Sequence, residues 1–292
     1  MSIIWSTAIF KEDSRFNIIN NEPKNLSKIF GRPKIRTSKS HIHTIADPFL
    51  VRRQQILYLF AEVQIINRPG FINCWSTDDG LSWTDHGVTL RKSFHLSFPF
   101  IFQEKDDFFM IPEQIESGKT EIYRFNDFPN QLSRFSTICE EPIEDPILIK
   151  SNSVFYLLGT FRDRLRLLFT NNLDGGPWST HPMDNQVKSK KIRNAGNPIE
   201  IDGTHYRFSQ DCSVTYGKEI MLKKIINLDK HNFQEKVIVK KISRSNIESF
   251  GKLGRHHISI CEFQNHKFIA IDGKGNDYFF NKFINGLFKL LS

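Results

Sequence analysis

The sequence predicts an all-β fold, a five-bladed β-propeller closed by an N-terminal strand, as a single domain over residues 1–292. The first observation is an internal repeat. A strand led by proline, a short polar turn and a second apolar strand recur five times. The anchor positions of these copies lie 47 to 59 residues apart, which is too long a period for helical solenoids. The second observation is that strand-like runs such as residues 70–77 fill the intervals. Four strands per repeat is the number found in a propeller blade.

The copies follow one another in a regular order. They cover residues 46–62, 97–113, 144–160, 196–211 and 255–272, and the last copy has His257 where the others have proline. Residues 2–10 are expected to supply a strand that completes the last blade, because closing the ring removes exposed sheet edges. Residues 186–197 and 232–254 lack the repeat pattern, so we expect them to be long connections between blades.

A turn motif lies between the third and fourth strands of the first repeat. The segment STDDGLSW, residues 76–83, has the pattern Ser-x-Asp-x-Gly-x-x-Trp. We expect Asp78 to accept hydrogen bonds from backbone amides of the loop, and Gly80 to adopt a positive φ. The motif resembles the Asp-box of sialidases and other propellers, where it is a structural turn, so we predict a folding role.

The composition limits the class of protein. An apolar fraction of 39% with 27 Phe is enough for a packed core and argues against intrinsic disorder. No run approaches the roughly 18 apolar residues of a membrane-spanning helix. The first residues lack the features of a secretory signal, so we expect a cytoplasmic protein. The four cysteines are too far apart for a zinc or redox motif and are expected to be free thiols.

The net charge of +8 fits an anionic membrane surface, a phosphorylated substrate or nucleic acid. No RNP pattern, zinc finger or helix-turn-helix signature is present, so we expect no nucleic-acid partner. Residues 277–292 place apolar side chains at helical spacing beside two lysines, which predicts a short amphipathic C-terminal helix. Such a helix either docks on the side of the propeller or makes peripheral contact with the anionic inner membrane face.

The repeats are expected to bring polar side chains to one rim of the ring. In an antiparallel hairpin, the start of the first strand lies beside the end of the second. The predicted rim therefore holds Asp47, Glu62, Phe98, Glu113, Glu144, Asp145, Asn197, Gln210, Asp211, His256 and Asp272. Any one of these acids could simply form a turn or end a solvated strand. Carboxylates that converge raise one another's pKa, which is how an acid and a base arise from similar side chains. Glycoside hydrolysis uses two such groups.

The histidines allow two interpretations. A metal site is one, but no HExxH-type spacing on a helix supports zinc. Hydrogen bonding to sugar hydroxyls is the other, because the histidines are spread over the repeats near the carboxylates. We therefore expect no metal and no cofactor.

The segments ADPF, HLSFP, MIPE, SQDCSVTYG and HH occur in this order across residues 45–272. In this respect the chain resembles the N-terminal domain of the plant glucosamine inositolphosphorylceramide transferases and its stand-alone bacterial relatives. That domain is similar in turn to the five-bladed propellers of arabinofuranosidase, xylosidase and invertase-type glycosidases. The resemblance implies that Asp47 matches the catalytic base or nucleophile, and that Glu144 or Asp145 lies near the general-acid position.

The chain departs from those glycosidases at one position. They carry a further Asp before the proline of the second blade, where it tunes the acid, and this sequence has Phe98 there. Glu113, at the end of the neighbouring strand, is the candidate substitute. The resemblance does not extend to the glycosyltransferase domain of the plant enzymes, so it does not imply their transfer activity for the propeller.

Two hypotheses follow. The first is an enzyme with glycosyl-transferring or glycosidase-like chemistry in surface polysaccharide or glycolipid biosynthesis. Its catalytic residues would come from Asp47, Glu113, Glu144 and Asp145. Its substrate-binding residues would be Glu62, His95, Arg207, Asp211, His256 and His257. The second is a non-catalytic propeller that holds a glycan or nucleotide sugar for a partner glycosyltransferase, which Phe98 favours. A sialidase fits less well, because five repeats are visible where six are needed.

Overall fold

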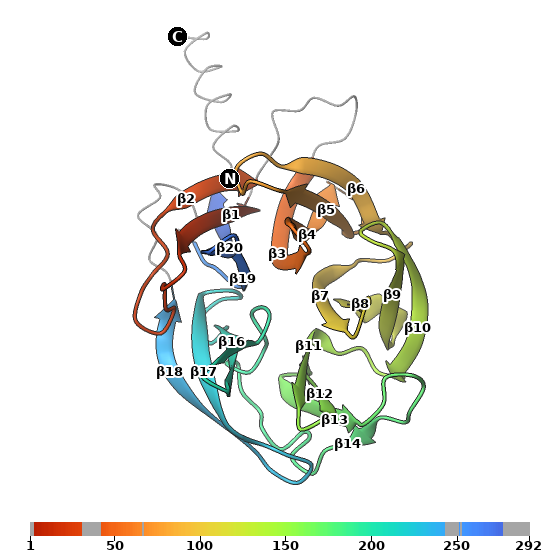
Figure 1. The fold of residues 1–292 in the computed structure, drawn as a ribbon. Coiled ribbons are helices and arrows are strands. Elements are labelled where there is room, and N and C mark those ends of the chain that lie inside the picture. The colour runs from red at the N-terminus through yellow and green to blue at the C-terminus, as the bar shows by residue number, and fades with distance from the viewer. Residues whose placement is uncertain (1–2, 31–41, 66, 243–250, 252, 277–292) are drawn as a thin grey trace, which may run out of the picture.

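The structure is a computed structural model that describes residues 3–30, 42–65, 67–242, 251 and 253–276. These residues form five four-stranded antiparallel sheets arranged as blades around a central axis (Figure 1). The predicted all-β, five-bladed propeller is therefore confirmed. The predicted amphipathic helix, residues 277–292, lies outside the described residues. No helix in the described part of the chain is long and apolar enough to cross a membrane.

Four blades are each built from consecutive strands. Blade 1 contains β3 (Ile42–Arg53), β4 (Ile56–Ile65), β5 (Phe71–Thr77) and β6 (Thr84–Leu90). Blade 2 contains β7 (Ser97–Glu104), β8 (Asp107–Glu113), β9 (Thr120–Asp127) and β10 (Gln131–Cys139), with a 3-10 helix, η1 (Ile115–Ser117), between β8 and β9. Blade 3 contains β11 (Glu144–Ser151), β12 (Val154–Phe161), β13 (Arg164–Thr170) and β14 (Ser179–Thr180). Blade 4 contains β15 (Ile199–Ile201), β16 (Thr204–Asp211), β17 (Glu219–Leu228) and β18 (Phe233–Ile242).

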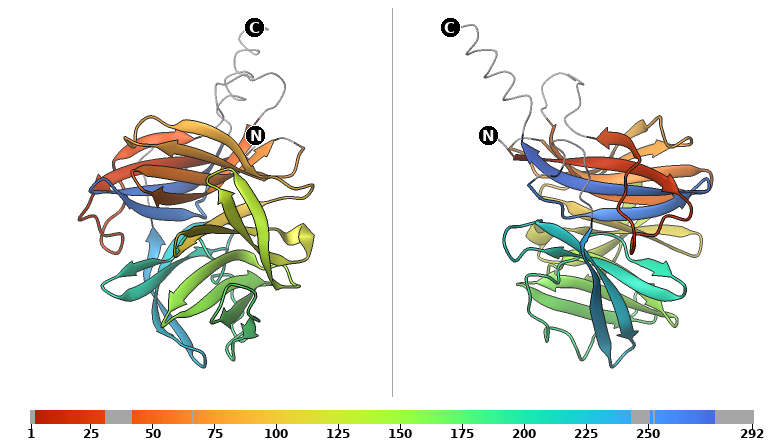
Figure 2. Two further views of the ribbon diagram at one scale, coloured as in Figure 1. Left: turned by 45° about the vertical axis from the view of Figure 1, so that its right-hand side comes forward. Right: turned by 90° about the vertical axis from the view of Figure 1, so that its left-hand side faces the viewer.

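Blade 5 joins the two ends of the described chain. It combines β19 (Ile258–Phe263) and β20 (His266–Asn276) with β1 (Ile3–Asp13) and β2 (Leu26–Phe30). Strand β1 pairs with β20 along its whole length, from Ile3 opposite Asn276 to Asp13 opposite His266. The red N-terminal strand runs beside the blue C-terminal strand in the right-hand view of Figure 2. The predicted closure by the N-terminal strand is confirmed, and the N-terminal segment supplies β2 as well.

Phenylalanine fills the space between neighbouring blades. Between blades 1 and 2, the ring of Phe128 lies 4.8 Å from the rings of Tyr58, Phe108 and Phe125 and 5.6 Å from that of Phe60. Aromatic pairs at these separations stabilise a core beyond the apolar area that they bury. The many Phe residues therefore serve the packing of one blade against the next.

Three blades share a backbone feature at the rim. Strands β3, β7 and β11 each contain a β-bulge next to their Asp-Pro or Phe-Pro pair. At these bulges Asp47, Phe98 and Asp145 have φ of 49°, 45° and 46°. A positive φ is uncommon for residues other than glycine, and bulges next to functional sites re-aim side chains. The repeat detected in the sequence thus encodes a rim in which the residue before proline is turned out of the strand.

The structure corrects two details of the sequence interpretation. In the turn at residues 76–83, Asp79 rather than Asp78 accepts the loop amides, those of Leu81 and Ser82. Gly80 has the expected positive φ of 75°, and a side chain there would collide with the ring of Phe268 in blade 5. Residues 232–254 are not wholly a connection, because Phe233–Ile242 form β18, the outer strand of blade 4. Outer strands face solvent on one side, so their apolar pattern is weaker.

Candidate active site

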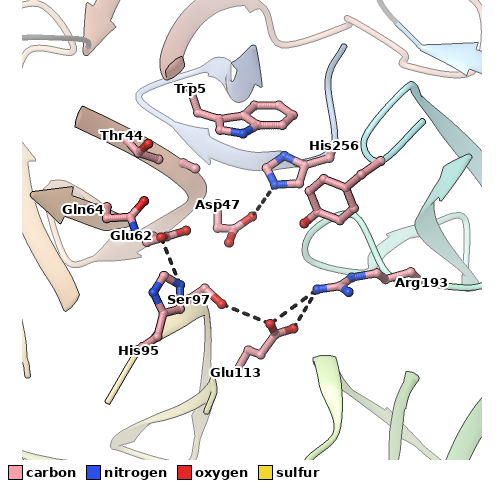
Figure 3. Close-up of a pocket in the computed structure, with 12 residues that line it drawn as sticks. Trp5, Thr44, Asp47, Glu62, Gln64, His95, Ser97, Glu113, Arg193 and His256 are labelled. Atoms are coloured by element: carbon pink, nitrogen blue, oxygen red, sulfur yellow. Dashed lines mark hydrogen bonds and ion pairs between the residues drawn. The ribbon is translucent and has the colours of Figure 1, made fainter. Parts of the chain in front are cut away.

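A polar cavity of about 190 Å³ lies where the rims of blades 1, 2 and 5 meet. Its lining consists of Trp5, Thr44, Ala46, Asp47, Glu62, Gln64, His95, Ser97, Glu113, Arg193, Tyr216 and His256. Figure 3 shows their side chains converging on one space, with Asp47 between His256 and Glu113. The repeat explains this convergence. Opposite the bulges, Glu62 pairs with Ala46 and Glu113 pairs with Ser97, so both acids occupy the same place in their blades.

Asp47 occupies the centre of the site. Its side chain is buried, and its Oδ2 accepts a hydrogen bond of 3.1 Å from the backbone N–H of Phe98. Its own backbone N–H donates to Oδ2 of Asp272 at 3.2 Å. Burial raises the pKa of Asp47 to about 7; the charge of His256 opposes this rise, and Glu62 adds to it. Asp47 can therefore gain or lose a proton near neutral pH.

His256 links Asp47 to a second buried acid. Its Nδ1 lies 2.6 Å from Oδ2 of Asp272, and its Nε2 lies 3.5 Å from Oδ1 of Asp47. The ring of Trp5 stacks on the imidazole with 4.0 Å between centroids, and Tyr216 meets it edge-on. Burial opposes the charged form of His256, but the two carboxylates raise its pKa to about 9. The imidazole is thus a cation near neutral pH.

Asp47, His256 and Asp272 also have ligand types that a cation could use, with ligand atoms within 4.8 Å of one another. Oδ1 of Asp272 accepts the backbone N–H groups of His256 and His257, and its Oδ2 accepts that of Asp47 and contacts the imidazole. A metal would have to replace these contacts. The donor set fits an ion pair reinforced by backbone N–H groups better than a metal centre.

Arg193 forms another wall of the cavity. Its Nη2 donates to Oε2 of Glu113 at 3.0 Å, its Nη1 donates to Glu144 at 3.2 Å, and its Nε donates to Asp145. Oε2 of Glu113 also accepts the backbone N–H of Asp145 at 2.8 Å. Burial raises the pKa of Glu144 and of Asp145, and the charge of Arg193 acts in the opposite direction. One guanidinium therefore serves three carboxylates.

Glu62 and His95 form the opposite wall. His95 Nε2 lies 3.2 Å from Oε1 of Glu62, and this hydrogen bond raises the pKa of His95. Oε2 of Glu62 has no hydrogen-bond partner in the described part of the chain, and the same holds for the hydroxyl of Thr44. Both residues are buried, with 8% of Glu62 and 6% of Thr44 exposed, and both line the cavity. They leave hydrogen-bonding capacity that a ligand can use.

The ten predicted site residues divide evenly. Five line the cavity: Asp47, Glu62, Glu113, His95 and His256. Glu144 and Asp145 do not line the cavity, but both contact Arg193, and Arg193 does line it. Arg207 is fully buried in blade 4 and binds Glu235, and Asp211 forms an ion pair with Lys191. His257 is packed edge-on against Phe49 and Phe98; burial lowers its pKa to about 3, so it is neutral.

The sequence did not mark Trp5, Thr44, Gln64, Ser97, Arg193 and Tyr216 as site residues. Arg193 lies in the connection 186–197, where no repeat pattern exists to place it. Trp5 belongs to the closing strand, and Tyr216 follows β16 in a loop. Only the strand order of the closed ring brings these segments to the cavity.

Residues 4–274 match the protein family described as glucosamine inositolphosphorylceramide transferase 1, N-terminal. The chain is 28% identical over 296 aligned positions to glucosamine inositolphosphorylceramide transferase 1 of Arabidopsis thaliana, in an alignment that covers 92% of this chain and 39% of the relative. It is 28% identical over 241 positions to the protein of that name from Oryza sativa subsp. japonica, in an alignment that covers 78% of this chain and 32% of the relative. The chain thus spans about two fifths or less of the length of these relatives.

The fold is similar to solved glycoside hydrolases. A family 43 β-xylosidase/α-arabinofuranosidase from a compost microbial metagenome, in complex with xylotriose, matches with a TM-score of 0.57 at 12% identity, covering 79% of this chain and 90% of that one. A family 117 glycoside hydrolase from Zobellia galactanivorans matches with a TM-score of 0.54 at 12% identity, covering 80% and 87%. This likeness is one of fold alone. Because the family match extends over nearly all of the propeller, the chain belongs to the family of the glucosamine inositolphosphorylceramide transferase 1 N-terminal domain.

Proposed function

We propose that this propeller binds one sugar unit of a glycan or glycolipid in its cavity and acts on it by glycosyl-transferring or glycosidase-like chemistry. The observation that carries the proposal is the convergence of Asp47, Glu62 and Glu113 on one cavity of about 190 Å³. Pockets for drug-sized ligands measure about 300–1,000 Å³, so this one suits a single sugar ring. The context we propose is the biosynthesis of a surface polysaccharide or glycolipid.

We assign Asp47 the role of catalytic base and Glu113 the role of catalytic acid in the glycosyl chemistry. Asp47 has a pKa of about 7, so at neutral pH it is both partly ionised and basic enough to take a proton from a hydroxyl group. Glu113 is the candidate acid on another side of the same space, and it would have to exchange its ion pair with Arg193 for a proton before it could protonate the leaving oxygen. Trp5 and Tyr216 add apolar ring surface to the lining beside the Trp5 face that stacks on His256, and the apolar side of a sugar can pack against this surface.

The charge of the site favours an amino sugar. The site has more acidic than basic side chains, counting those that line the cavity and those that bind its cations. The acids are Asp47, Glu62, Glu113, Glu144, Asp145 and Asp272. The basic groups are Arg193, His95 and His256. A cationic ligand group would relieve this excess, because opposite charge stabilises buried carboxylates. The open Oε2 of Glu62 is the acceptor we assign to it. The relatives matched above carry glucosamine in their name, which supports the same ligand class.

The test is incubation of the purified protein with a panel of sugar donors and acceptors, followed by mass spectrometry. The panel pairs each amino sugar with its N-acetylated and neutral analogues, as free, nucleotide-linked and lipid-linked forms. Asp47→Asn should abolish product formation, whereas Asp211→Asn, a matched carboxylate outside the cavity, should retain it. Product formed equally by Asp47→Asn would remove Asp47 from the mechanism.

A non-catalytic binding propeller is the second candidate. It is favoured by Arg193, which occupies Glu113, Glu144 and Asp145 together, and by Phe98, which stands where the glycosidases have an acid. In that case a sugar protects the fold against heat without being converted, and Asp47→Asn still binds it. The propeller would then present its sugar to a partner glycosyltransferase, which affinity capture with the sugar-loaded protein would detect.

We place this function in the cytoplasm, with peripheral contact at the inner membrane face. The net charge of +8 supports attraction to anionic lipid, since each basic residue near such a surface contributes about 1 kcal/mol. Co-sedimentation with anionic but not with neutral vesicles is the expected result. Equal partitioning to both would remove the electrostatic contact from the proposal.

A further inference from the structure

The segment that carries Arg193 is attached to blade 4 by its main chain. Five consecutive carbonyls, those of residues 190–194, all accept hydrogen bonds from blade 4 or from the residue that follows β16. Their donors are, in order, the Cys212 N–H, the Lys223 Nζ, the Arg207 Nη1, the Gln210 N–H and the Gln210 Nε2, at distances of 2.8 to 2.9 Å. This connection lies outside the named strands, but an unbroken series of hydrogen bonds joins it to blade 4.

Two of these donors are buried cations. Arg207 is fully buried, and its Nε and Nη2 bind both oxygens of Glu235 at 2.5 and 2.7 Å. Lys223, 6% exposed, binds the same carboxylate at 2.8 Å. Two buried cations therefore share one acid. Burying such groups is costly unless every donor finds a partner. The consecutive carbonyls of Lys191 and Ile192, directly before Arg193, supply two of those partners.

The connection also contacts blade 3. Nδ2 of Asn194 donates to the carbonyls of Asp145 and Leu158, and Oδ1 of Asn194 accepts from Arg207. Arg207 is therefore connected, through one side chain, to the backbone of an acid that Arg193 binds. The main chain on both sides of Arg193 is fixed relative to the carboxylates that its guanidinium serves.

We propose that Arg207 and Lys223 are positioning residues for Arg193, which they hold in place so that its guanidinium lies among Glu113, Glu144 and Asp145. The inference uses the site of the proposed function, but it does not depend on which sugar binds there. Arg207, expected from the sequence to bind substrate, acts in this view through another residue. The long Arg193 side chain has many rotamers, and a fixed main chain limits the positions its guanidinium can reach.

The test measures the ionisation of Glu144 in the protein without a ligand. An opposite charge at this range lowers the pKa of a carboxyl by about 1–3 units, so Arg193→Met should move the ¹³C NMR titration of the Glu144 carboxyl upward by that amount. Lys223→Met keeps the Arg207–Glu235 pair but loses the bond to the Lys191 carbonyl. It should move the same titration in the same direction by a smaller amount.

Lys224→Met is the matched control, because Lys224 is the next residue of β17 and is only half-buried. It should leave the Glu144 titration unchanged. In the Arg193→Met background, Lys223→Met should have no further effect. If Lys223→Met does not fold, Arg207→Lys is the substitute variant. It keeps the buried charge but loses the bidentate contact with Glu235, and the same upward shift of the Glu144 titration is expected.

The proposal is overturned if Lys223→Met or Arg207→Lys lowers the melting temperature but leaves the Glu144 titration in place. It is also overturned if Lys223→Met shifts that titration equally with and without Arg193. Because no sugar is present, these outcomes do not depend on the proposed function. Failure to find a sugar ligand would leave the titration result valid, and an unchanged titration would leave the sugar assay open.

Discussion

Replacing Asp47 by asparagine should inactivate the site and stabilise the fold above neutral pH. An acid whose pKa is raised by folding binds its proton more tightly in the folded protein than in the unfolded chain. The free energy of unfolding therefore falls as the pH rises from about 4 to 7. The rise from 3.8 to about 7 is some three units, which corresponds to about 4 kcal/mol of lost stability at pH 8. Asparagine avoids this cost and still accepts the Phe98 N–H.

The assay is thermal unfolding followed by circular dichroism at pH 4 and pH 8, with the wild type and Asp47→Asn side by side. The variant should melt at a higher temperature at pH 8, and the difference should nearly disappear at pH 4, where both forms of residue 47 are neutral. Mass spectrometry at pH 7 checks the loss of turnover in the same preparations. A variant that is less stable at pH 8 would show that the Asp47 charge stabilises the ring and would refute the argument from burial.

Three further substitutions test neighbouring parts of the argument. Asp272→Asn should have the opposite effect and destabilise the fold. Burial tends to raise the pKa of Asp272, but His256 lowers it below its usual value. Breaking this buried pair should lower the free energy of unfolding by about 3–5 kcal/mol, measured as a lower denaturant midpoint. Trp5→Ala should weaken sugar binding by about 1 kcal/mol through loss of an aromatic face, measured by calorimetry, while an unchanged affinity would place the sugar elsewhere. Asp79→Ala should lower the melting temperature, whereas Asp78→Ala should not, and equal effects would contradict the assignment of the turn.

The buried acids of the rim also connect the blades. Asp272 of blade 5 accepts the backbone N–H of Asp47, Asp47 of blade 1 accepts that of Phe98, and Glu113 of blade 2 accepts that of Asp145. Each donating N–H belongs to a residue that precedes proline and has a positive φ, and it donates to an acid of the preceding blade. The Asp47 carboxylate therefore links blades 1 and 2, in addition to the chemical role proposed for it above.

This joint role explains the place of Phe98. The position before proline needs a backbone N–H for the preceding blade and an unusual φ, and Phe98 meets both requirements without an acid. Its side chain instead packs against the rings of Phe49 and His257. The rim therefore keeps its architecture without an acid at position 98, and Arg193 contacts three of the acids that remain, Glu113, Glu144 and Asp145.

The sequence alone determined the five repeats, the closing strand and the meeting of Asp47, Glu62, Glu113 and His256, because each follows from strand alternation and from the equivalence of repeated units. It could not place Arg193, since the connection 186–197 has no period and its position is set by hydrogen bonds from another blade. Nor could it separate acids that line the cavity from those that do not. Burial and pairing depend on which side chains meet across the ring, and only the tertiary structure decides those distances.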